Sequence, residues 1–185
     1  LKTPESIVKK LKNDGCEVSI DNMVEHLNDI AGIRIICSFM SDIYPIADMI
    51  ARQADITVLH VKDYIKYPKT NGYKSYHMVV TIPVYLSEGK RDTKVEIQIR
   101  TIAMDFWASL EHKIAYKFEG KAPDYLEREL KSCADMVDML DMKMFSLNQA
   151  IMAVEEEERR VEEEKRRERE KAEKRQEELA GNGPT

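Results

Sequence analysis

Apolar and polar positions along the chain follow two periods, which separate predicted helices from predicted strands. Apolar residues at helical spacing predict helices over residues 3–11, 21–27, 41–54 and 102–118. Runs rich in β-branched residues predict strands over residues 31–39, 56–64, 76–86 and 94–100. We expect Asp21 to cap the second helix, and Ser41 or Asp42 to cap the third. The order of these elements indicates an α+β domain.

After residue 126 the pattern changes to a heptad repeat. Apolar residues recur in alternating steps of four and three at Leu126, Leu130, Cys133, Val137, Leu140, Met144, Leu147, Ile151 and Val154, which we call the heptad seam. The seam either packs on its own domain or pairs with other subunits, and we expect oligomerisation. Residues 155–178 hold 12 acidic and 9 basic residues, which is typical of a solvated helix.

These patterns divide the chain of 185 residues into three parts. Residues 1–120 are the expected catalytic core, residues 121–154 the oligomerisation helix, and residues 155–185 a charged, partly disordered tail. The net charge is −5, and most of the charged residues in excess of an ordinary composition lie in the tail. The core is therefore nearly neutral, which does not suggest a nucleic-acid binder.

Cysteine usage and hydropathy indicate a cytoplasmic protein. The three cysteines are far apart and form no C-x-x-C pair, so neither a zinc site nor a disulfide framework is predicted. We find no run of 18 apolar residues and no signal peptide, and we expect no membrane association. The first residue is Leu1 rather than Met, so we expect the natural start of the protein to be missing.

The predicted strand KVEIQIR, residues 94–100, alternates strictly between apolar and polar side chains. Successive side chains of a strand point to opposite faces, so the three apolar residues are expected to face the core. Glu96, Gln98 and Arg100 then share the other face. An acid, an amide and a base in one row can line a cleft for a charged ligand, although an ordinary half-solvated strand has the same pattern.

Two other segments carry candidate chemistry. Asp29 precedes a predicted strand that contains Arg34. A carboxylate at such a position suits Mg²⁺, above all if Glu96 from a neighbouring strand joins it. Arg34 could pair with a buried acid or stack on a base.

The loop between the strands at 56–64 and 76–86 is locally basic and rich in tyrosine. Lysines bind phosphates and tyrosine rings stack on bases, but a solvated hairpin loop is an equal alternative. A lone histidine such as His77, at the start of the following strand, is more often structural. The basic and aromatic residues of this region are Lys62, Lys66, Lys69, Lys74, Tyr64, Tyr67, Tyr73 and Tyr76.

Five segments in this order resemble the synthetase domain of the RelA/SpoT homologue family, over roughly residues 2–118. They read KTPESIVKKL, DIAGIRIICSF, VKDYIKYPKTNGYKSYH, VEIQIRT and FWASLEHKIAYK. A synthetase core followed by a long helix looks like the small, single-domain alarmone synthetases. The resemblance implies a mixed sheet flanked by helices, similar to nucleotidyltransferases, and a homotetramer assembled through helices outside the core.

The resemblance also implies an activity, in which pyrophosphate passes from ATP to the 3′-hydroxyl of GTP or GDP and gives AMP and (p)ppGpp. It makes Asp29 and Glu96 the Mg²⁺ ligands, with Glu96 placed to activate the acceptor hydroxyl. Arg34 would stack on adenine and Tyr73 on guanine. Lys2 and Lys10 match residues near the donor phosphates. The further acceptor-site candidates are Lys62, Lys69, Lys74, His77 and Gln98.

Bifunctional relatives carry Arg-x-Lys-Asp where this chain has His60-Val61-Lys62-Asp63, which leaves the choice between GTP and GDP open. Two alternatives to GTP or GDP pyrophosphorylation remain open. A toxin of the same fold would pyrophosphorylate the 3′ end of tRNA and should carry an extra basic surface. A non-catalytic RNA-binding module would use the lysine and tyrosine loop without needing Asp29 and Glu96 together.

Overall fold

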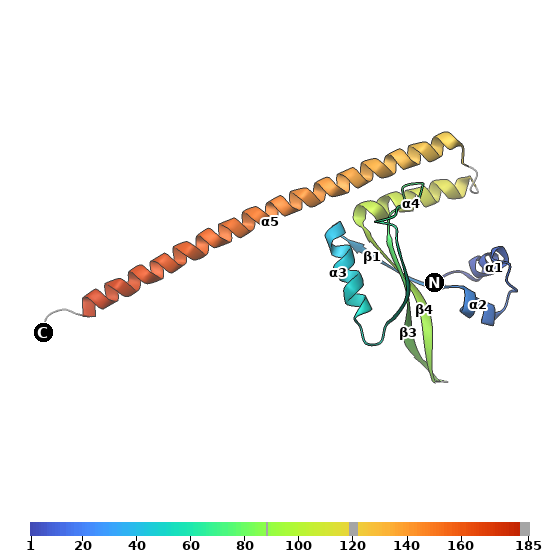
Figure 1. Cartoon of the computed structure of the whole chain (residues 1–185), viewed down its shortest axis with the longest axis horizontal. Coiled ribbons are helices and arrows are strands. Elements are labelled where there is room, and N and C mark those ends of the chain that lie inside the picture. The colour runs from blue at the N-terminus through green and yellow to red at the C-terminus, as the bar shows by residue number, and fades with distance from the viewer. Residues whose placement is uncertain (88, 119–121, 182–185) are drawn as a thin grey trace. The chain divides into compact units, whose positions relative to one another are not determined.

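The structure, a computed structural model, describes residues 1–87, 89–118 and 122–181. The described chain forms two compact units, Leu1–Met142 and Lys143–Thr185. In order, the elements are α1 (Pro4–Asn13), α2 (Ile20–His26), β1 (Ala31–Cys37), α3 (Met40–Ala51), β2 (Thr57–Asp63), β3 (Tyr76–Leu86), β4 (Gly89–Thr101), α4 (Ile102–Lys117) and α5 (Asp124–Gly181) (Figure 1).

Four strands form one mixed sheet in the order β1-β4-β3-β2. Strand β4 pairs in parallel with β1 and antiparallel with β3, and β2 and β3 are also antiparallel. The expected α+β fold with a mixed sheet and a long C-terminal helix is therefore confirmed. Among the described residues, no helix is both long and apolar enough to cross a bilayer.

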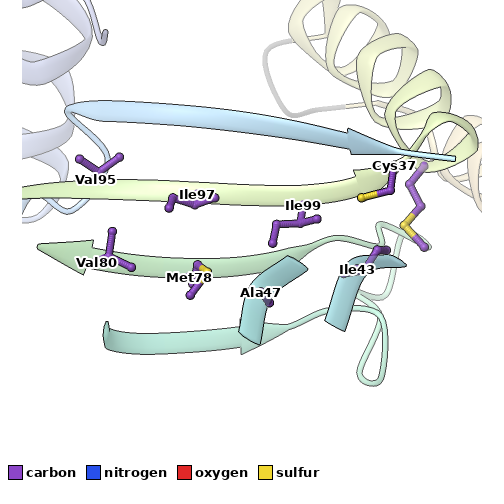
Figure 2. Close-up of a cluster of buried hydrophobic side chains, with 9 residues drawn as sticks. Cys37, Ile43, Ala47, Met78, Val80, Val95, Ile97 and Ile99 are labelled. Carbon is purple, nitrogen blue, oxygen red and sulfur yellow. The ribbon is translucent and has the colours of Figure 1, made fainter. Parts of the chain in front are cut away.

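The core lies on the face of the sheet that α3 covers (Figure 2). Val95, Ile97 and Ile99 of β4 are buried there, with Ile43 and Ala47 of α3 packed against the strands. The alternation predicted for β4 is thus confirmed, and the opposite face is left to polar side chains. Strand β4 begins at Gly89, earlier than the pattern predicted, because the hairpin pairs its polar first half with β3.

The predicted helix caps were wrong by two or three residues. Helix α2 begins at Ile20, and the hydroxyl of Ser19 accepts a hydrogen bond from the Asn22 amide at 3.2 Å. Helix α3 begins at Met40, and the carboxylate of Asp42 accepts one from the Phe39 amide at 3.1 Å. In each case a polar side chain within three residues of the predicted cap satisfies a free amide of the first turn.

The first part of α5 packs on the domain that precedes it. The Trp107 indole of α4 donates to the Leu130 carbonyl at 3.0 Å, and Ala134 is buried against Trp107 and Ala108. Further along α5, the buried Asp141 accepts a hydrogen bond from Thr101 at 2.6 Å. The early seam residues Leu126, Leu130 and Val137 are partly buried, whereas Cys133 is exposed.

From Leu140 onward the heptad seam is exposed. Leu140, Met144, Leu147, Ile151 and Val154 are each at least 50% exposed. The predicted boundary between core and seam at residues 120–121 lies outside the described residues, and so do residues 182–185 of the predicted tail. The division into three parts and the oligomerisation role stay predictions.

Gly72 lies against α5, in the loop between β2 and β3 that we call the tyrosine loop (residues 64–75). Its φ of +89° lies in the left-handed region, and a Cβ there would stand 2.4 Å from the Ala134 Cβ. We expect Gly72→Ala to lower the free energy of unfolding by about 2–4 kcal/mol, from backbone strain together with the steric clash. Thermal unfolding of the full chain measures this change.

Gly15 provides the matched control for Gly72. It has a φ of +73°, but no atom lies within 4 Å of an added Cβ. Gly15→Ala should therefore show the backbone strain alone, about 1 kcal/mol. Adding Ala134→Gly to Gly72→Ala should recover most of the difference between the two variants. An equal loss of stability in both alanine variants would show that Gly72 does not hold the loop against α5.

Candidate active site

The register of the sheet places four of the predicted site residues in one row. Arg34 of β1 is paired with Gln98 of β4, Gln98 with His77 of β3, and His77 with Lys62 of β2. Paired residues share a face, so these four side chains cross the whole sheet on the face opposite α3. Glu96 lies two residues before Gln98 on that face. Segments far apart in the sequence thereby form one polar surface.

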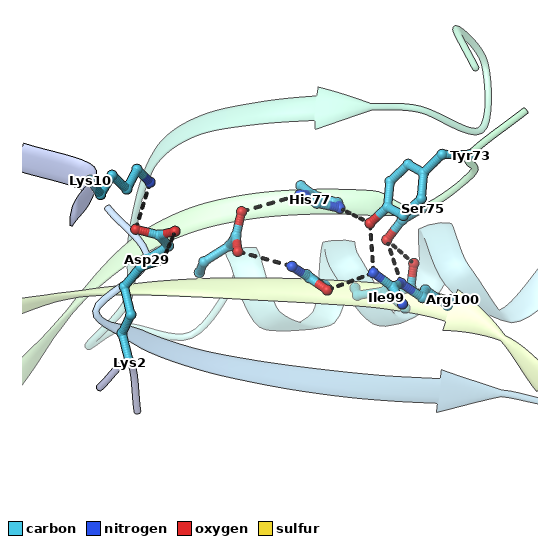
Figure 3. Close-up of polar contacts among 10 residues, drawn as sticks. Lys2, Lys10, Asp29, Tyr73, Ser75, His77, Ile99 and Arg100 are labelled. Carbon is cyan, nitrogen blue, oxygen red and sulfur yellow. Dashed lines mark hydrogen bonds and ion pairs between the residues drawn. The ribbon is translucent and has the colours of Figure 1, made fainter. Parts of the chain in front are cut away.

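Three of these side chains close a ring of hydrogen bonds together with Tyr73 and Arg100 (Figure 3). His77 Nδ1 lies 3.1 Å from Glu96 Oε1, and His77 Nε2 lies 2.8 Å from the Tyr73 hydroxyl. Arg100 Nη2 donates to the Tyr73 hydroxyl at 2.6 Å and to Gln98 Oε1 at 2.8 Å. Gln98 Nε2 donates to Glu96 Oε2 at 3.0 Å, which completes the ring.

The ring fixes the direction of each hydrogen bond when His77 is neutral. An ionised carboxylate can only accept, so His77 Nδ1 carries the proton and donates to Glu96. His77 Nε2 then accepts from the Tyr73 hydroxyl, whose oxygen accepts from Arg100. Each Glu96 oxygen receives one hydrogen bond and keeps lone pairs free, because a carboxylate has about four acceptor positions.

The ring also keeps Glu96 charged. The hydrogen bond from His77 lowers the pKa of the Glu96 carboxyl, burial raises it, and the hydrogen bond from Gln98 lowers it again, so that it lies below its ordinary value. The negative charge of Asp29 acts in the opposite direction and raises the pKa. Glu96 and Asp29 therefore lie close enough for their charges to interact.

Asp29 is held between two lysines just before β1. Lys2 Nζ lies 2.7 Å from Asp29 Oδ2, and Lys10 Nζ lies 2.8 Å from Asp29 Oδ1 (Figure 3). Burial raises the pKa of Asp29, but the hydrogen bonds from Lys10 and Lys2 outweigh it and leave the pKa lowered. The amide of Lys2 also donates to the Ile30 carbonyl at 2.9 Å, which ties this end of the chain to the sheet.

Arg34 and Arg100 share one acceptor. Arg34 Nη1 and Arg100 Nη1 each lie 3.1 Å from Oδ1 of Asp105, in the first turn of α4. The Arg34 side chain is 50% exposed, whereas that of Arg100 is 5% exposed. The face of one guanidinium is thus open to a ligand while the other is enclosed by protein.

Two lysines of the tyrosine loop, Lys69 and Lys74, lie in different environments. Lys69 Nζ lies 5.0 Å from the centroids of both the Tyr64 and Tyr73 rings and is exposed, so it can meet an anion beside either ring. Lys74 Nζ instead lies 2.5 Å from the Asp138 carboxylate of α5. An anion would compete with Asp138 for Lys74, which makes Lys74 the weaker candidate.

A cavity lies beside the tyrosine loop, next to α4 and the start of α5. It has a volume of about 760 Å³ and is lined by Lys69, Asn71, Glu111, Arg128 and Lys131, among others. Neither Asp29 nor Glu96 lines it. Glu111 accepts a hydrogen bond from Asn71 at 3.3 Å.

Asp29 and Glu96 supply two carboxylates, the kind of oxygen ligand that Mg²⁺ prefers. No cluster of three or more histidine, cysteine or acidic side chains suited to a metal occurs in the part of the chain that the structure describes. Two interacting carboxylates can hold Mg²⁺ when phosphate oxygens and water supply the other ligands. A divalent cation would also relieve the repulsion between them, so the donor set fits.

Sequence reasoning left Arg100 and Asp105 without a role. Alternation along β4 places Arg100 on the same face as Glu96 and Gln98, and this pattern could have identified Arg100 as a site residue. Nothing local marks Asp105, because its partners come from β1 and from the end of β4. The same holds for Asp138, which pairs with Lys74 across 64 positions of sequence.

Comparison with known proteins identifies the family. Residues 1–121 match the model described as the region found in RelA / SpoT proteins. The chain is 50% identical over 151 residues to the GTP pyrophosphokinase YwaC of Bacillus subtilis, covering 82% of this chain and 72% of that protein. The resemblance inferred from the five sequence segments is therefore confirmed.

Solved structures agree with this comparison. The small alarmone synthetase 2 from Bacillus subtilis has a TM-score of 0.74 at 49% identity and covers 80% of this chain and 77% of its own. The small alarmone synthetase 1 from the same organism, bound to its product pppGpp, has a TM-score of 0.76 at 36% identity, with coverages of 80% and 75%. That synthetase bound to AMPCPP has a TM-score of 0.68 at 32% identity, with coverages of 82% and 75%.

Proposed function

The chain belongs to the RelA/SpoT family, and on that premise we propose that it is a small alarmone synthetase that transfers pyrophosphate from ATP to the 3′-hydroxyl of GTP or GDP. One observation carries the proposal: Glu96 is held ionised on the strand that separates Arg34 from His77 and Tyr73. Two stacking groups on either side of a reactive carboxylate suit two purine nucleotides.

The proposed reaction is a displacement at the β-phosphorus of ATP. The acceptor 3′-oxygen forms a bond to that phosphorus, the bond to the oxygen bridging the α- and β-phosphates breaks, and AMP leaves with the electron pair. Glu96 accepts the proton of the 3′-hydroxyl through one of its free lone pairs. Positioning and charge neutralisation contribute most of the rate in such transfers, and no covalent enzyme intermediate is needed.

Mg²⁺ is the proposed cofactor, held by Asp29 and Glu96 together with phosphate oxygens. When bound, it would neutralise negative charge on the donor phosphates. Lys2 and Lys10, which pair with Asp29 in this structure, would turn toward those phosphates instead. The same lysines would therefore balance the Asp29 charge before ATP binds and the donor charge afterwards.

The proposal is tested by incubating the protein with Mg²⁺, ATP and either GTP or GDP, and separating the nucleotides by anion exchange. We expect a guanosine nucleotide with two additional phosphates and an equal amount of AMP, and the relative rates rank the two acceptors. If neither acceptor gives that product while tRNA is modified at its 3′ end, the toxin alternative replaces the proposal. RNA binding without turnover would favour the binding module.

We expect the rate to depend on pH through Glu96 and His77. Glu96 must be ionised, so kcat falls as the pH drops through its pKa. The hydrogen bond from His77 makes the largest contribution to lowering the pKa of Glu96, and burial opposes it. His77→Ala should therefore raise the pKa and move the acidic limb of the kcat profile to higher pH. Profiles at saturating substrate measure the shift, and a limb that stays in place would separate His77 from Glu96 ionisation.

Self-association through the exposed part of the heptad seam is also proposed, with a homotetramer as the expected state. Leu147→Glu and Ile151→Glu place charges on exposed apolar residues of the seam and should lower the mass per particle in sedimentation of the full chain. Gln149→Glu is the matched control, because Gln149 lies about half a turn of the helix away from the seam. An unchanged mass in the seam variants would count against this interface.

A further inference from the structure

Asp105 is the one described carboxylate that contacts both Arg34 and Arg100. It lies in the first turn of α4, directly after the strand that carries Glu96, Gln98 and Arg100. Its Oδ1 atom accepts a hydrogen bond from Arg100 Nη1 at 3.1 Å and forms an ion pair with Arg34 Nη1, also at 3.1 Å. Two guanidinium groups that serve different parts of the site therefore meet at a single oxygen.

Arg100 needs this carboxylate because it is buried. Its side chain is 5% exposed, and its other donors go to neutral groups: Nε to the Ser75 hydroxyl at 3.3 Å, and Nη2 to Gln98 Oε1 and the Tyr73 hydroxyl. A buried arginine is stable when an acidic partner balances its charge. With Asp105 in place, Arg100 holds the Tyr73 hydroxyl and also lies against the Tyr73 ring, 5.2 Å from its centroid.

Arg34 needs the carboxylate for a different reason. Half of its side chain is exposed, and a long side chain free to rotate loses entropy when it stacks on a base. The ion pair between Nη1 and Asp105 restricts the guanidinium while leaving its face open. A planar guanidinium held in this way can stack on a planar ring.

We propose that Asp105 is a positioning residue that orients Arg34 for the donor base and, through Arg100, Tyr73 for the acceptor base. This inference rests on the proposed function. Asp105 itself touches neither nucleotide, so its loss should weaken the binding of both while leaving kcat at saturation nearly unchanged. The effect on the donor should pass through Arg34, and the effect on the acceptor through Arg100.

The test measures nucleotide binding by the full chain without turnover, using calorimetry with AMPCPP or GDP in the presence of Mg²⁺. Asp105→Asn should weaken binding of each nucleotide about tenfold, the size expected for losing a charge-assisted hydrogen bond. In an Arg34→Ala background, Asp105→Asn should cost nothing further for AMPCPP but still weaken GDP. Asp92→Asn, an exposed acid on β4 that pairs with Lys90, is the control and should leave both affinities unchanged.

The Asp105→Glu variant distinguishes a loss of positioning from a loss of folding. It keeps a charge for Arg100 but moves the carboxylate by one methylene, so the melting temperature should hold while AMPCPP affinity falls. A lower melting temperature with unchanged affinities, or additive losses of AMPCPP affinity with Arg34→Ala, would overturn the inference. If the wild type makes the product and Asp105→Asn leaves both affinities unchanged, the inference alone is refuted. If the wild type binds neither nucleotide, the proposed function is refuted as well.

Discussion

Replacing Glu96 with glutamine should reduce kcat by about 10²–10⁴-fold, the range typical of losing a general base. The change keeps the shape of the side chain but removes its charge. The His77 Nδ1–H and Gln98 Nε2–H bonds both point at Glu96, and an amide can accept only through its one oxygen. Glutamine would therefore leave one donor without an acceptor, weaken the metal site and provide no base.

Nucleotide binding separates this result from misfolding. The groups proposed to stack on the two bases, Arg34 and Tyr73, are unchanged in Glu96→Gln, so AMPCPP and GDP should still bind in calorimetry. Glu129→Gln, at an exposed position of α5, makes the same chemical change away from the site and should keep full activity. A Glu96→Gln enzyme with most of its turnover would remove Glu96 from the catalytic role.

Replacing Tyr73 with alanine should raise the KM for the acceptor about 5- to 150-fold, since stacking on an aromatic ring is worth about 1–3 kcal/mol. The KM for ATP should change much less. Tyr73→Phe keeps the ring but loses the hydroxyl that accepts from Arg100 and contacts His77. The phenylalanine variant should therefore retain most acceptor affinity. Its kcat should be lower, because His77, which contacts Glu96, loses its hydrogen bond to the Tyr73 hydroxyl.

Two checks accompany the Tyr73 series. Tyr73 packs against the buried Trp107 and Ala108 cluster, so each variant needs a melting temperature before its kinetics are compared. Tyr67, in the same loop but 68% exposed, is the matched tyrosine, and Tyr67→Ala should leave both KM values near the wild type. Equal losses for ATP and acceptor in Tyr73→Ala would contradict the assignment of Tyr73 to guanine.

Much of this site could be anticipated from local sequence. Alternation along one strand placed Glu96, Gln98 and Arg100 on a single face, and the register of the sheet then added Arg34, His77 and Lys62 to it. Alternation is reliable here because one face of the strand is fully buried, which leaves the chain no freedom to exchange its two faces.

What could not be predicted depends on contacts between distant segments. Counting charges in the tyrosine loop made Lys74 a free cation, but Asp138 neutralises it from a helix encoded far downstream. The same limitation hid Asp105, whose two arginine partners meet only once β1 has paired with β4. Cap positions were missed for a smaller reason, since several neighbouring polar residues can serve the same free amides.

The order of strands has a consequence for how the protein is made. β4 is the last strand to leave the ribosome, yet it occupies the position between β1 and β3. Until β4 is inserted, β1 and the inner edge of β3 have no partners, and unpaired strand edges favour aggregation of a growing chain. Glu96 arrives with that strand, so the nascent chain completes its sheet and acquires the carboxylate proposed as its base in the same step.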